Sequence, residues 1–400
     1  MMRNECDILV SGAGIAGMAA ARGLAAQGFR VCLVDPSPPV QDAGHDRADL
    51  RSTAFLRPAR TLFEDLDLWP ALADHATPLD ALRLVDTVGM PPRIRESRTF
   101  LAGDLGVDSF GWNLPNWLTR RELARALEGT ERLEVRWGTG FAGMLVRDRE
   151  VRVKLTDGTR IRTRLVLGLD GRRSAVAEAA GIDTRVTRYG QKALALAVTH
   201  DAPHGNVSTE IYNSGGAFVT VPLPDHDGHP ASAVVWMEDG PRALDLSRLD
   251  ETALAQALTA RSCGLLGPMR PATAVRLWPV VTQRAARLTG RRTALAAEAA
   301  HVLPPIGAQG LNTSLADVAA LLDALRDRPD PGAEAPLAAY ARARARDLAA
   351  RTAAIDMFNR ICRSGSAPVQ DLRLAGLRAV HGLAPLRRAV MRAGLGEAAG

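Results

Sequence analysis

Glycines near the N-terminus have the spacing of a site that binds the pyrophosphate of a dinucleotide. The motif G-x-G-x-x-G occupies residues 12–17, directly after the apolar run 8–10 and before a segment of small residues. In such motifs the first glycine permits a tight turn, the second lets the backbone approach the phosphates, and the third allows close packing of helix and strand. The free N–H groups of the helix N-terminus attract the phosphates. A second apolar run ends at Asp35, whose carboxylate is placed to accept hydrogen bonds from ribose hydroxyls.

A second copy of this pattern occurs at residues 138–143, but its surroundings differ. Charged residues follow at 147–150 in place of a small-residue helix, and alternating apolar residues at 151–155 lead to the turn pair Asp157-Gly158. This arrangement predicts a β-hairpin, with the glycines in a loop between strands. We therefore predict one dinucleotide-binding unit, which disfavours reductases that carry a separate nicotinamide-binding domain.

Two further positions could contribute to the same site. The apolar run 165–169 predicts a buried strand that ends at a strand-to-helix junction, where Asp170 and Gly171 follow it. Residues 51–54 are predicted to open an amphipathic helix, from which Arg51 could bind phosphate oxygens through its guanidinium fork.

A loop rich in proline and glycine occupies residues 304–312 and precedes a predicted helix over 314–325. Ser314 and Asp317 have the spacing of a capping box at the start of that helix. Backbone N–H groups at a helix N-terminus stabilise negative charge, such as the charge that a reduced flavin carries on its ring. We expect His301, just before the loop, to be a packed or solvated histidine and not a catalytic base.

The composition is that of a globular enzyme. The chain has 400 residues, enough for two or three domains, with 46% hydrophobic and 24% charged residues. Its four cysteines form no C-x-x-C pair, which predicts reduced thiols in a cytoplasmic protein and no structural metal site. Acidic residues close to the first apolar run argue against a signal peptide, and no apolar run reaches the ~20 residues that a membrane span needs.

Positive charge is concentrated at the C-terminal end. Residues 341–400 contain eleven arginines and four acidic residues, a net charge of +7, so the first 340 residues sum to −1 of the total +6. A basic tail can meet anionic lipid, nucleic acid or an acidic partner, and the absence of a recognisable module leads us to expect no nucleic acid. The leucines at 372–390 alternate with arginines and a kink is predicted at Pro385; both core packing and a membrane-surface face explain this pattern.

Taken together, the three separated motifs resemble a known enzyme class. The N-terminal glycine motif, the Asp170-Gly171 junction and the P-P-x-G-x-Q-G-x-N loop at 304–312 closely resemble class A flavoprotein monooxygenases, the single-component FAD-dependent aromatic hydroxylases. Residues 51–56 and 112–117 make the chain most similar to ubiquinone-biosynthesis hydroxylases of the UbiH/UbiF/Coq6 type. The resemblance covers nearly the whole chain.

The fold that the resemblance and the sequence pattern predict is α/β. We expect a Rossmann-like FAD-binding domain of the glutathione-reductase and p-hydroxybenzoate-hydroxylase type, formed by residues 1–77, 119–185 and 285–335. Alternating residues over 190–278 predict an antiparallel sheet. This sheet would form an inserted substrate domain made of residues 78–118 and 186–284. A C-terminal helical region would follow at 336–400, starting with a long helix over 338–361.

The resemblance also implies where FAD binds. The glycine motif and Asp35 would hold the ADP half, and Arg51 and Arg120 would contact the pyrophosphate and ribityl region. Asp170-Gly171 would touch FAD and help to bind NAD(P)H, and Glu298 would meet a ribityl hydroxyl. The full set of implied cofactor-binding residues is Gly12, Gly14, Ile15, Ala16, Gly17, Asp35, Arg51, Arg120, Asp170, Gly171, Glu298, Pro305, Gly307, Gln309, Gly310, Leu311 and Asn312.

Three departures from the family pattern stand out. Ala297-Glu298 replaces the usual Gly-Asp, Ala308 replaces a glycine before Gln309, and Asp35 replaces the commoner Glu. No catalytic acid or base and no metal ligand is predicted. The expected walls of the substrate pocket are Trp112, Tyr212 and Phe218.

The activity that the resemblance implies is hydroxylation of the aromatic ring of a prenylated phenol in ubiquinone biosynthesis. NAD(P)H would reduce FAD, which would react with O2 to a C4a-hydroperoxide. Alternatives are hydroxylation of another soluble phenol, a flavin halogenase, a plain NAD dehydrogenase and a flavin-bearing scaffold. The W-x-W-x-I-P motif of halogenases is absent, and the late flavin loop disfavours a dehydrogenase.

A location follows from the implied substrate. A prenylated phenol partitions into the bilayer, so its hydroxylase must work at the membrane surface. We therefore expect a cytoplasmic protein that binds peripherally to anionic lipid at the inner face of the membrane through its basic C-terminal segment. Other quinone-biosynthesis proteins are candidate partners.

Overall fold

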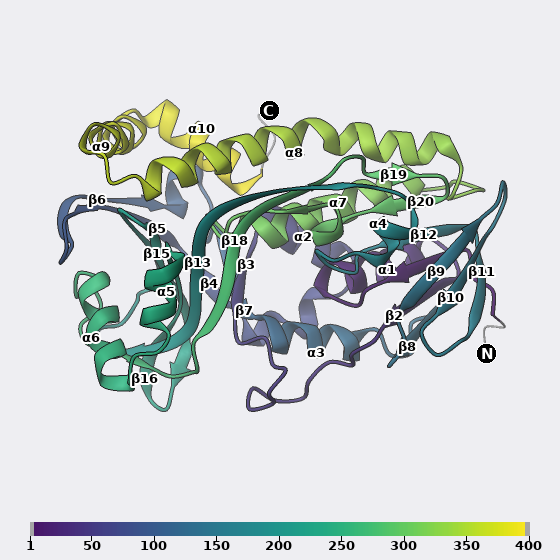
Figure 1. The fold of residues 1–400 in the computed structure, drawn as a ribbon, viewed down its shortest axis with the longest axis horizontal. Helices are drawn as coiled ribbons and strands as arrows, with labels where there is room; N and C mark the ends of the chain where they lie inside the picture. The colour runs from purple at the N-terminus through teal and green to yellow at the C-terminus, as the bar shows by residue number, and fades with distance from the viewer. Residues whose placement is uncertain (1–3, 397–400) are drawn as a thin grey trace.

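A sheet of six strands organises the N-terminal part of the chain in the computed structural model, which describes residues 4–396 (Figure 1). The strand order is β19-β20-β12-β1-β2-β8, and neighbours are parallel except for the pair β19-β20. The short connection from β1 to β2 runs through one helix, as a parallel crossover requires. The elements are β1 (Ile8–Ser11), α1 (Ile15–Ala26), β2 (Val31–Asp35), β8 (Leu133–Trp137), β12 (Leu165–Gly168), β19 (Thr289–Gly290) and β20 (Thr293–Leu295).

Small residues allow a close helical layer against this sheet. Helix α1 packs on α7 (Gln309–Leu325), and a Cβ at Gly23 would lie 2.6 Å from a Leu322 methyl carbon, so a larger residue there would require the Leu322 side chain to shift. Helices α2 (Arg57–Asp65) and α3 (Asn116–Ala126) complete this layer, and α4 (Ala175–Ala179) follows β12. Leu321, Val318 and the strand residues beneath them are almost fully buried and form the main apolar core.

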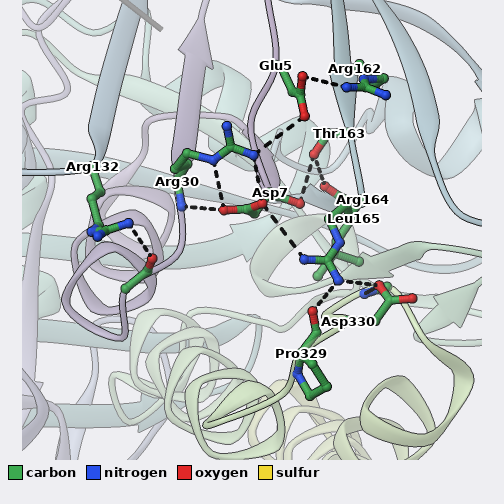
Figure 2. A network of polar contacts seen from close by, with 12 residues as sticks. Glu5, Asp7, Arg30, Arg132, Arg162, Thr163, Arg164, Leu165, Pro329 and Asp330 are labelled. Atoms are coloured by element: carbon green, nitrogen blue, oxygen red, sulfur yellow. Dashed lines mark hydrogen bonds and ion pairs between the residues drawn. The ribbon is translucent and has the colours of Figure 1, made fainter.

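An ion-pair network closes the edge of the parallel sheet that lies opposite the glycine turn. Asp7 precedes β1 and accepts hydrogen bonds from the backbone and side chain of Arg30 (Figure 2). Glu5 pairs with Arg30 and Arg162, and Arg164 reaches Asp330 in the segment before the long C-terminal helix. The network therefore connects the first strand to chain segments far away in the sequence.

The second G-x-G-x-x-G copy does not lead into a helix, as predicted, but only residues 138–140 lie in a connecting loop, because residues 141–143 belong to a strand. Phe141–Val146 forms β9, which pairs with β10 (Val151–Leu155), and β10 pairs with β11 (Arg160–Thr163) across the Asp157-Gly158 turn. The three strands form a separate antiparallel sheet, in which β10 alternates buried and exposed residues. No helix follows these glycines, so they have no helix N-terminus to offer a phosphate.

A large sheet forms the other half of the molecule (Figure 1). Its strand order is β21-β18-β13-β16-β15-β14-β5-β6, with β17 paired to β13, and all pairs are antiparallel except β14-β5. The strands are β5 (Ala81–Val88), β6 (Arg93–Leu101), β13 (Thr184–His200), β14 (Val207–Asn213), β15 (Gly216–His226), β16 (His229–Asp239), β17 (Met269–Pro271), β18 (Arg276–Ala285) and β21 (His301–Val302).

Helices interrupt the region for which the sequence predicted alternation throughout. Between β16 and β17 lie α5 (Gly240–Leu246) and α6 (Glu251–Arg261), which pack on one face of the large sheet. Asp250 caps α6 by accepting a hydrogen bond from the amide of Ala253. The antiparallel sheet itself is confirmed, while the domain boundaries in residue numbers remain a prediction.

Two helix starts differ from the prediction. Residues 52–56 do not open a helix but form β3 (Ser52–Leu56), because they pair with β7 (Gly111–Pro115), which also pairs with β4 (Thr77–Leu79). Helix α7 starts at Gln309 instead of near Ser314, and neither Ser314 nor Asp317 caps it.

Three helices end the described chain. The long helix α8 (Glu334–Arg363) runs across both halves of the molecule, α9 (Ala367–Gly382) lies beside β6, and α10 (Ala384–Leu395) packs on α9 (Figure 1). Residues 364–366 separate α8 from α9, and the predicted kink at Pro385 is confirmed as the interruption between α9 and α10. None of the helices within residues 4–396 combines the length and the apolar character that crossing a membrane requires.

Candidate active site

A cavity of about 1330 Å³ lies between the parallel sheet and the large sheet. Residues at the carboxyl ends of β1, β2 and β12 line one end of it, and apolar residues of the large sheet and of α8, α9 and α10 line the other. This volume exceeds the ~300–1,000 Å³ of a usual ligand pocket. The cavity can therefore hold an extended cofactor and a second molecule together.

The glycine turn at the end of β1 forms one wall, and each of its glycines has a distinct place. A Cβ at Gly12 would collide with the carbonyl oxygen of Leu169, and a Cβ at Gly17 would collide with that of Gly12. These two positions accept only glycine because backbone atoms are that close. Gly14 has an ordinary extended conformation, and its Cβ would meet no protein atom within 4 Å. Gly14 therefore faces open space at the N-terminus of α1, where phosphate groups bind.

Asp35 ends β2 and organises the loops on either side of it. Its carboxylate accepts hydrogen bonds from the amides of Ala13 and Ser37, at 2.7 Å and 2.8 Å. Arg120 from α3 joins the same carboxylate at 3.1 Å and donates to the carbonyl of Ala13 at 2.9 Å. Both side chains line the cavity, so α3 holds the glycine turn in place while one face of the pair stays open to a ligand.

Asp170 supplies an unsatisfied acceptor to the cavity. Its Oδ2 accepts a hydrogen bond from the amide of Val176 at 3.2 Å, whereas its Oδ1 is buried and has no hydrogen-bond partner among the described residues. Burial raises the pKa of this carboxyl. Because buried polar atoms are nearly always paired, the free oxygen indicates a donor that a bound ligand provides. The neighbouring Gly171 has φ +81°, a conformation that favours glycine.

Arg51 and Glu298 line the cavity between its two ends. The Arg51 guanidinium pairs with Asp49 at 2.7 Å and lies over the Trp278 ring, 4.3 Å from its centre. Burial alone would lower the pKa of the Arg51 guanidinium, but Asp49, with a smaller contribution from the exposed Glu298, raises it. The two charges border the region where the sequence predicted the pyrophosphate and ribityl chain.

The Pro-Gly loop reaches the cavity with backbone atoms at the start of α7. Pro305, Gly307, Gln309, Gly310 and Leu311 line the cavity. The polar atoms of the Gln309 side chain bond to protein groups: the amide nitrogen donates to the carbonyls of Gly307 and Gly394, and the amide oxygen accepts from Arg351. Asn312 is not among the lining residues.

Asn312 has a structural position instead. Its amide oxygen accepts a hydrogen bond from Leu56 at 2.9 Å, and its amide nitrogen donates to the carbonyls of Ala54 and Ala308. Asn312 therefore joins the end of β3 to the loop. Asn312 holds the residues that form the cavity wall without lining the cavity itself. The predicted direct contact between Asn312 and FAD therefore has no support in the structure.

A buried charged cluster supports the loop from the side of α7. Asp317 is fully buried, contacts the ring Nε2 of His301 at 2.7 Å and accepts from Arg344 at 2.7 Å. The same carboxylate accepts the amide of Ala297, the residue before Glu298. Burial alone would raise the pKa of Asp317, but His301 and Arg344 outweigh it and hold this pKa below its usual value. His301 is thus a packed residue, as expected, although it also lines the cavity.

Of the three predicted pocket walls, only Tyr212 lines the cavity. Phe218 packs against Trp236 in the core on the other face of β15, while its neighbours Val219 and Val221 line the cavity. Trp112 contacts Trp69 and Arg60 on the far side of β7. Both predictions were wrong because successive side chains in a strand point to opposite faces.

The sequence reading missed most of the second end of the cavity. Ser208, Glu210 and Tyr212 line it from alternate positions of β14, and this spacing of two was the available signal. The apolar lining on this side comes from several elements, among them Leu82, Leu84, Phe100, Val235, Phe358, Leu377, Val380 and Met391. In the described part of the chain, no group of three His, Cys, Asp or Glu side chains is placed to hold a metal ion.

Comparison with known proteins gives this arrangement a family. The family model described as FAD binding domain matches residues 5–354, and the chain belongs to this family. It is 32% identical over 399 residues to ubiquinone hydroxylase UbiL of Rhodospirillum rubrum, a match that covers 98% of this chain and 89% of the relative. It is 25% identical over 400 residues to 3-demethoxyubiquinol 3-hydroxylase of Escherichia coli, covering 99% of this chain and all of the relative.

Solved structures agree on the fold. The structure of p-nitrophenol 4-monooxygenase PnpA from Pseudomonas putida DLL-E4 superposes with a TM-score of 0.79 at 19% identity, covering 99% of this chain and all of that one. HpxO from Klebsiella pneumoniae, solved as a single-residue variant with FAD, superposes with a TM-score of 0.78 at 16% identity, covering 98% of both chains. The protein is an FAD-dependent monooxygenase, and the resemblance to ubiquinone-biosynthesis hydroxylases is confirmed.

The cavity fits the cofactor of this class. Gly14 leaves open space at a helix N-terminus, the unpaired Asp170 oxygen awaits a donor, and the volume exceeds what one small ligand needs. Pyrophosphate oxygens match the first feature, and hydroxyl groups of a nucleotide cofactor match the second. The residues of this chain therefore fit FAD.

Proposed function

We propose that this protein hydroxylates the aromatic ring of a prenylated phenol in ubiquinone biosynthesis, with NAD(P)H and O2 as co-substrates. The relatives named ubiquinone hydroxylase and 3-demethoxyubiquinol 3-hydroxylase support this substrate class. Bound FAD supplies the redox chemistry, which is reduction by NAD(P)H and transfer of one oxygen atom from O2 to the ring. The protein binds and orients both molecules and excludes water from the place where they meet.

The observation that carries this proposal is the composition of the cavity beyond the cofactor-binding residues. Apolar side chains of the large sheet and of α9 and α10 line this part, including Leu82, Phe100, Leu377 and Val380. A prenyl tail is purely apolar, and burying it in such a channel is favourable by ~25 cal/mol for each Å² removed from water. A soluble phenol without a tail would leave this channel unfilled.

The residues of this chain have separate tasks in the proposed reaction. Gly14 and the N-terminus of α1 would hold the pyrophosphate, Asp35 the ribose, and Asp170 and Glu298 hydroxyl groups of the cofactor. Backbone amides of the loop at 304–310 would face the flavin ring and stabilise its reduced, negatively charged form. Asp317 and Asn312 act from behind by fixing the segments that carry these groups.

We also propose that α10 places the cavity mouth on an anionic membrane surface. Leu383, Leu386 and Val390 are 58%, 39% and 45% exposed, and Val390 also lines the cavity. Arg388 and Arg392 lie exposed on the same helix and pair with no acidic side chain in residues 4–396, unlike Arg373, Arg378 and Arg387. Exposed leucines beside free arginines are the pattern of a helix that lies in the lipid headgroup layer. Other quinone-biosynthesis proteins remain candidate partners at this surface.

Deletion of the gene tests the proposed substrate class. Mass spectrometry of the lipid extract should show loss of the mature quinone and accumulation of a prenylated precursor with one fewer oxygen on its ring. Re-expression of the intact chain should restore the quinone. An unchanged quinone profile after deletion in cells with no second hydroxylase of this type would contradict the proposal.

A further inference from the structure

A buried carboxyl group faces the cavity at the end away from the cofactor-binding glycines. Glu210 lies on β14 and is 5% exposed, and Tyr212, two residues further along the same face, is 4% exposed. Both line the cavity, and the Tyr212 hydroxyl donates a hydrogen bond to Glu210 Oε2. The redox chemistry described above makes no use of this pair. Uncompensated carboxylates are rare inside proteins because burial of the charge is costly.

The surroundings of Glu210 leave it without a cationic partner. Among the described residues no arginine, lysine or histidine forms an ion pair with it, since the nearby Arg373 is committed to Asp86, at 2.5 Å, and to the carbonyl of Thr87. Cys362 of α8 also lies close, and burial raises the pKa of its thiol, so it is uncharged at neutral pH. The groups that bond to the Glu210 carboxyl are the Tyr212 hydroxyl and the amide of Gly307, and neither carries a positive charge.

The position of Glu210 suits a group that exchanges a proton. Burial raises the pKa of its carboxyl, whereas the hydrogen bonds from Tyr212 and from the amide of Gly307 lower it. Gly307 belongs to the loop expected to face the flavin ring, so the Glu210 carboxyl lies beside this loop in the cavity lining. Buried carboxyls with a raised pKa in a cavity are the usual acids and bases of enzymes.

We propose that Glu210 is the base that accepts the phenolic proton of the substrate, with Tyr212 holding its carboxylate in place. This inference rests on the proposed function, because it requires a phenol in the cavity. The O–H bond of the phenol breaks, an O–H bond forms on the carboxyl, and the electron pair stays on the phenolate oxygen. The buried site has one negative charge before and after the transfer, so no charge is added to it. A phenolate ring is richer in electrons and accepts an electrophilic oxygen more readily than a phenol.

Binding of 4-nitrophenol to the FAD-loaded protein tests the transfer without turnover. This probe reports its own ionisation by its visible absorbance, and proton exchange can be measured in parallel by calorimetry in buffers of different ionisation enthalpy. At about pH 8.5 a typical carboxyl is ionised in the free protein, and the probe is ionised in solution. We expect each binding event to take up one proton while the bound probe keeps the phenolate spectrum. The two results together place the proton on the protein.

Variants then assign this proton to a residue. Glu210→Gln has no carboxylate to accept a proton. It should therefore bind the probe as phenolate without proton uptake, or as phenol, in which case the proton taken up is on the probe. Binding as phenolate together with proton uptake is not expected. Tyr212→Phe should retain the uptake but shift its onset to higher pH, because it removes a hydrogen bond that lowers the pKa of Glu210. The matched controls are Glu238→Gln, a buried carboxyl with a raised pKa outside the cavity lining, and Tyr189→Phe, whose hydroxyl bonds to Asp356.

Both controls should behave like the wild type. Three results would each overturn the assignment of Glu210: failure of the wild type to bind the probe, phenolate binding without proton uptake in the wild type, or phenolate binding with proton uptake in Glu210→Gln. The proposed function is tested separately by the quinone profile of the deletion strain. If the deletion strain loses its quinone as expected but the proton-uptake experiment contradicts Glu210, only the assignment of Glu210 is rejected and the proposed function stands.

Discussion

The Asp317 carboxylate and the ring Nε2 of His301 lie 2.7 Å apart in the interior, and the same carboxylate holds Arg344 and the amide of Ala297. Asp317 is thus the point at which α7, α8 and the segment before the flavin loop are joined. Removing one member of a buried charge cluster leaves the others unpaired, which is costly.

We expect Asp317→Asn to destabilise the protein by ~3–5 kcal/mol in urea unfolding. Asp323→Asn on the same helix, where the ion pair with Arg326 is exposed, should change little and serves as the control. Equal changes in the free energy of unfolding for the two substitutions would show that the buried cluster stabilises the protein no more than an exposed ion pair does.

The same residue predicts a pH dependence. Because the pKa of Asp317 is lower in the folded protein than in the unfolded chain, its contribution is complete above about pH 4 and is lost as the pH falls through the folded value. Stability of the wild type should therefore fall more steeply in acid than that of Asp317→Asn. Parallel curves would contradict the assignment of this ion cluster.

Two of the departures from the family pattern coincide with backbone strain. Ala297 and Ala308 have φ of +55° and +54°, in the left-handed region that disfavours residues with a Cβ. We expect Ala297→Gly and Ala308→Gly each to stabilise the folded protein, by up to ~1 kcal/mol. Ala296→Gly, at a neighbouring buried position with φ −142°, should destabilise it and is the matched control. Destabilisation in all three variants would contradict the strain argument.

The glycine motif gives a prediction about cofactor binding. Gly14→Val should fold normally, because a Cβ at this position meets no protein atom within 4 Å, but should weaken FAD binding ~10–100-fold by occupying the space of the pyrophosphate. Gly143→Val in the second G-x-G-x-x-G copy also has free space and should keep full FAD affinity. Normal FAD content of purified Gly14→Val would remove the proposed phosphate site.

The membrane proposal depends on two arginines of α10. Reversing both charges, Arg388→Glu with Arg392→Glu, should weaken flotation with anionic liposomes on the order of 30-fold at low salt, since each basic residue contributes about 1 kcal/mol at such a surface. The control reverses Arg342 and Arg346 on α8, which are also exposed and form no ion pair within residues 4–396. Binding that is absent in the wild type, or insensitive to the α10 variant, would leave a freely diffusing phenol as the better substrate.

Local sequence predicted the parts of the site that depend on neighbouring residues. The glycine turn, Asp35 and the Asp170-Gly171 junction lie where expected, because each is fixed by one strand, one turn and one helix. The charged residues that follow the second G-x-G-x-x-G copy correctly predict that it does not begin a helix and is not a second dinucleotide-binding turn. The loop at 304–310 also lines the cavity as its proline and glycine pattern predicts.

Features that depend on long-range pairing were not predictable in this way. The local sequence of residues 52–56 predicts the start of a helix, but pairing with β7 makes these residues a strand. Trp112 and Phe218 point away from the cavity, because which face of a strand is buried in which layer depends on the neighbouring elements. The role of Glu210 could not be predicted from its neighbours in the sequence. Its burial depends on α8, α9 and the flavin loop, which are distant in the sequence and surround the same cavity as β14.

The most direct test of the proposed function follows the oxygen atom itself. The FAD-loaded protein would be incubated with NAD(P)H, a prenylated phenol in anionic vesicles, and ¹⁸O₂, and the product analysed by mass spectrometry. We predict a product with one added hydroxyl group whose oxygen carries the ¹⁸O label, formed together with oxidation of NAD(P)H. Oxidation of NAD(P)H that yields only hydrogen peroxide and leaves the phenol unchanged, or incorporation of oxygen from water, would contradict it.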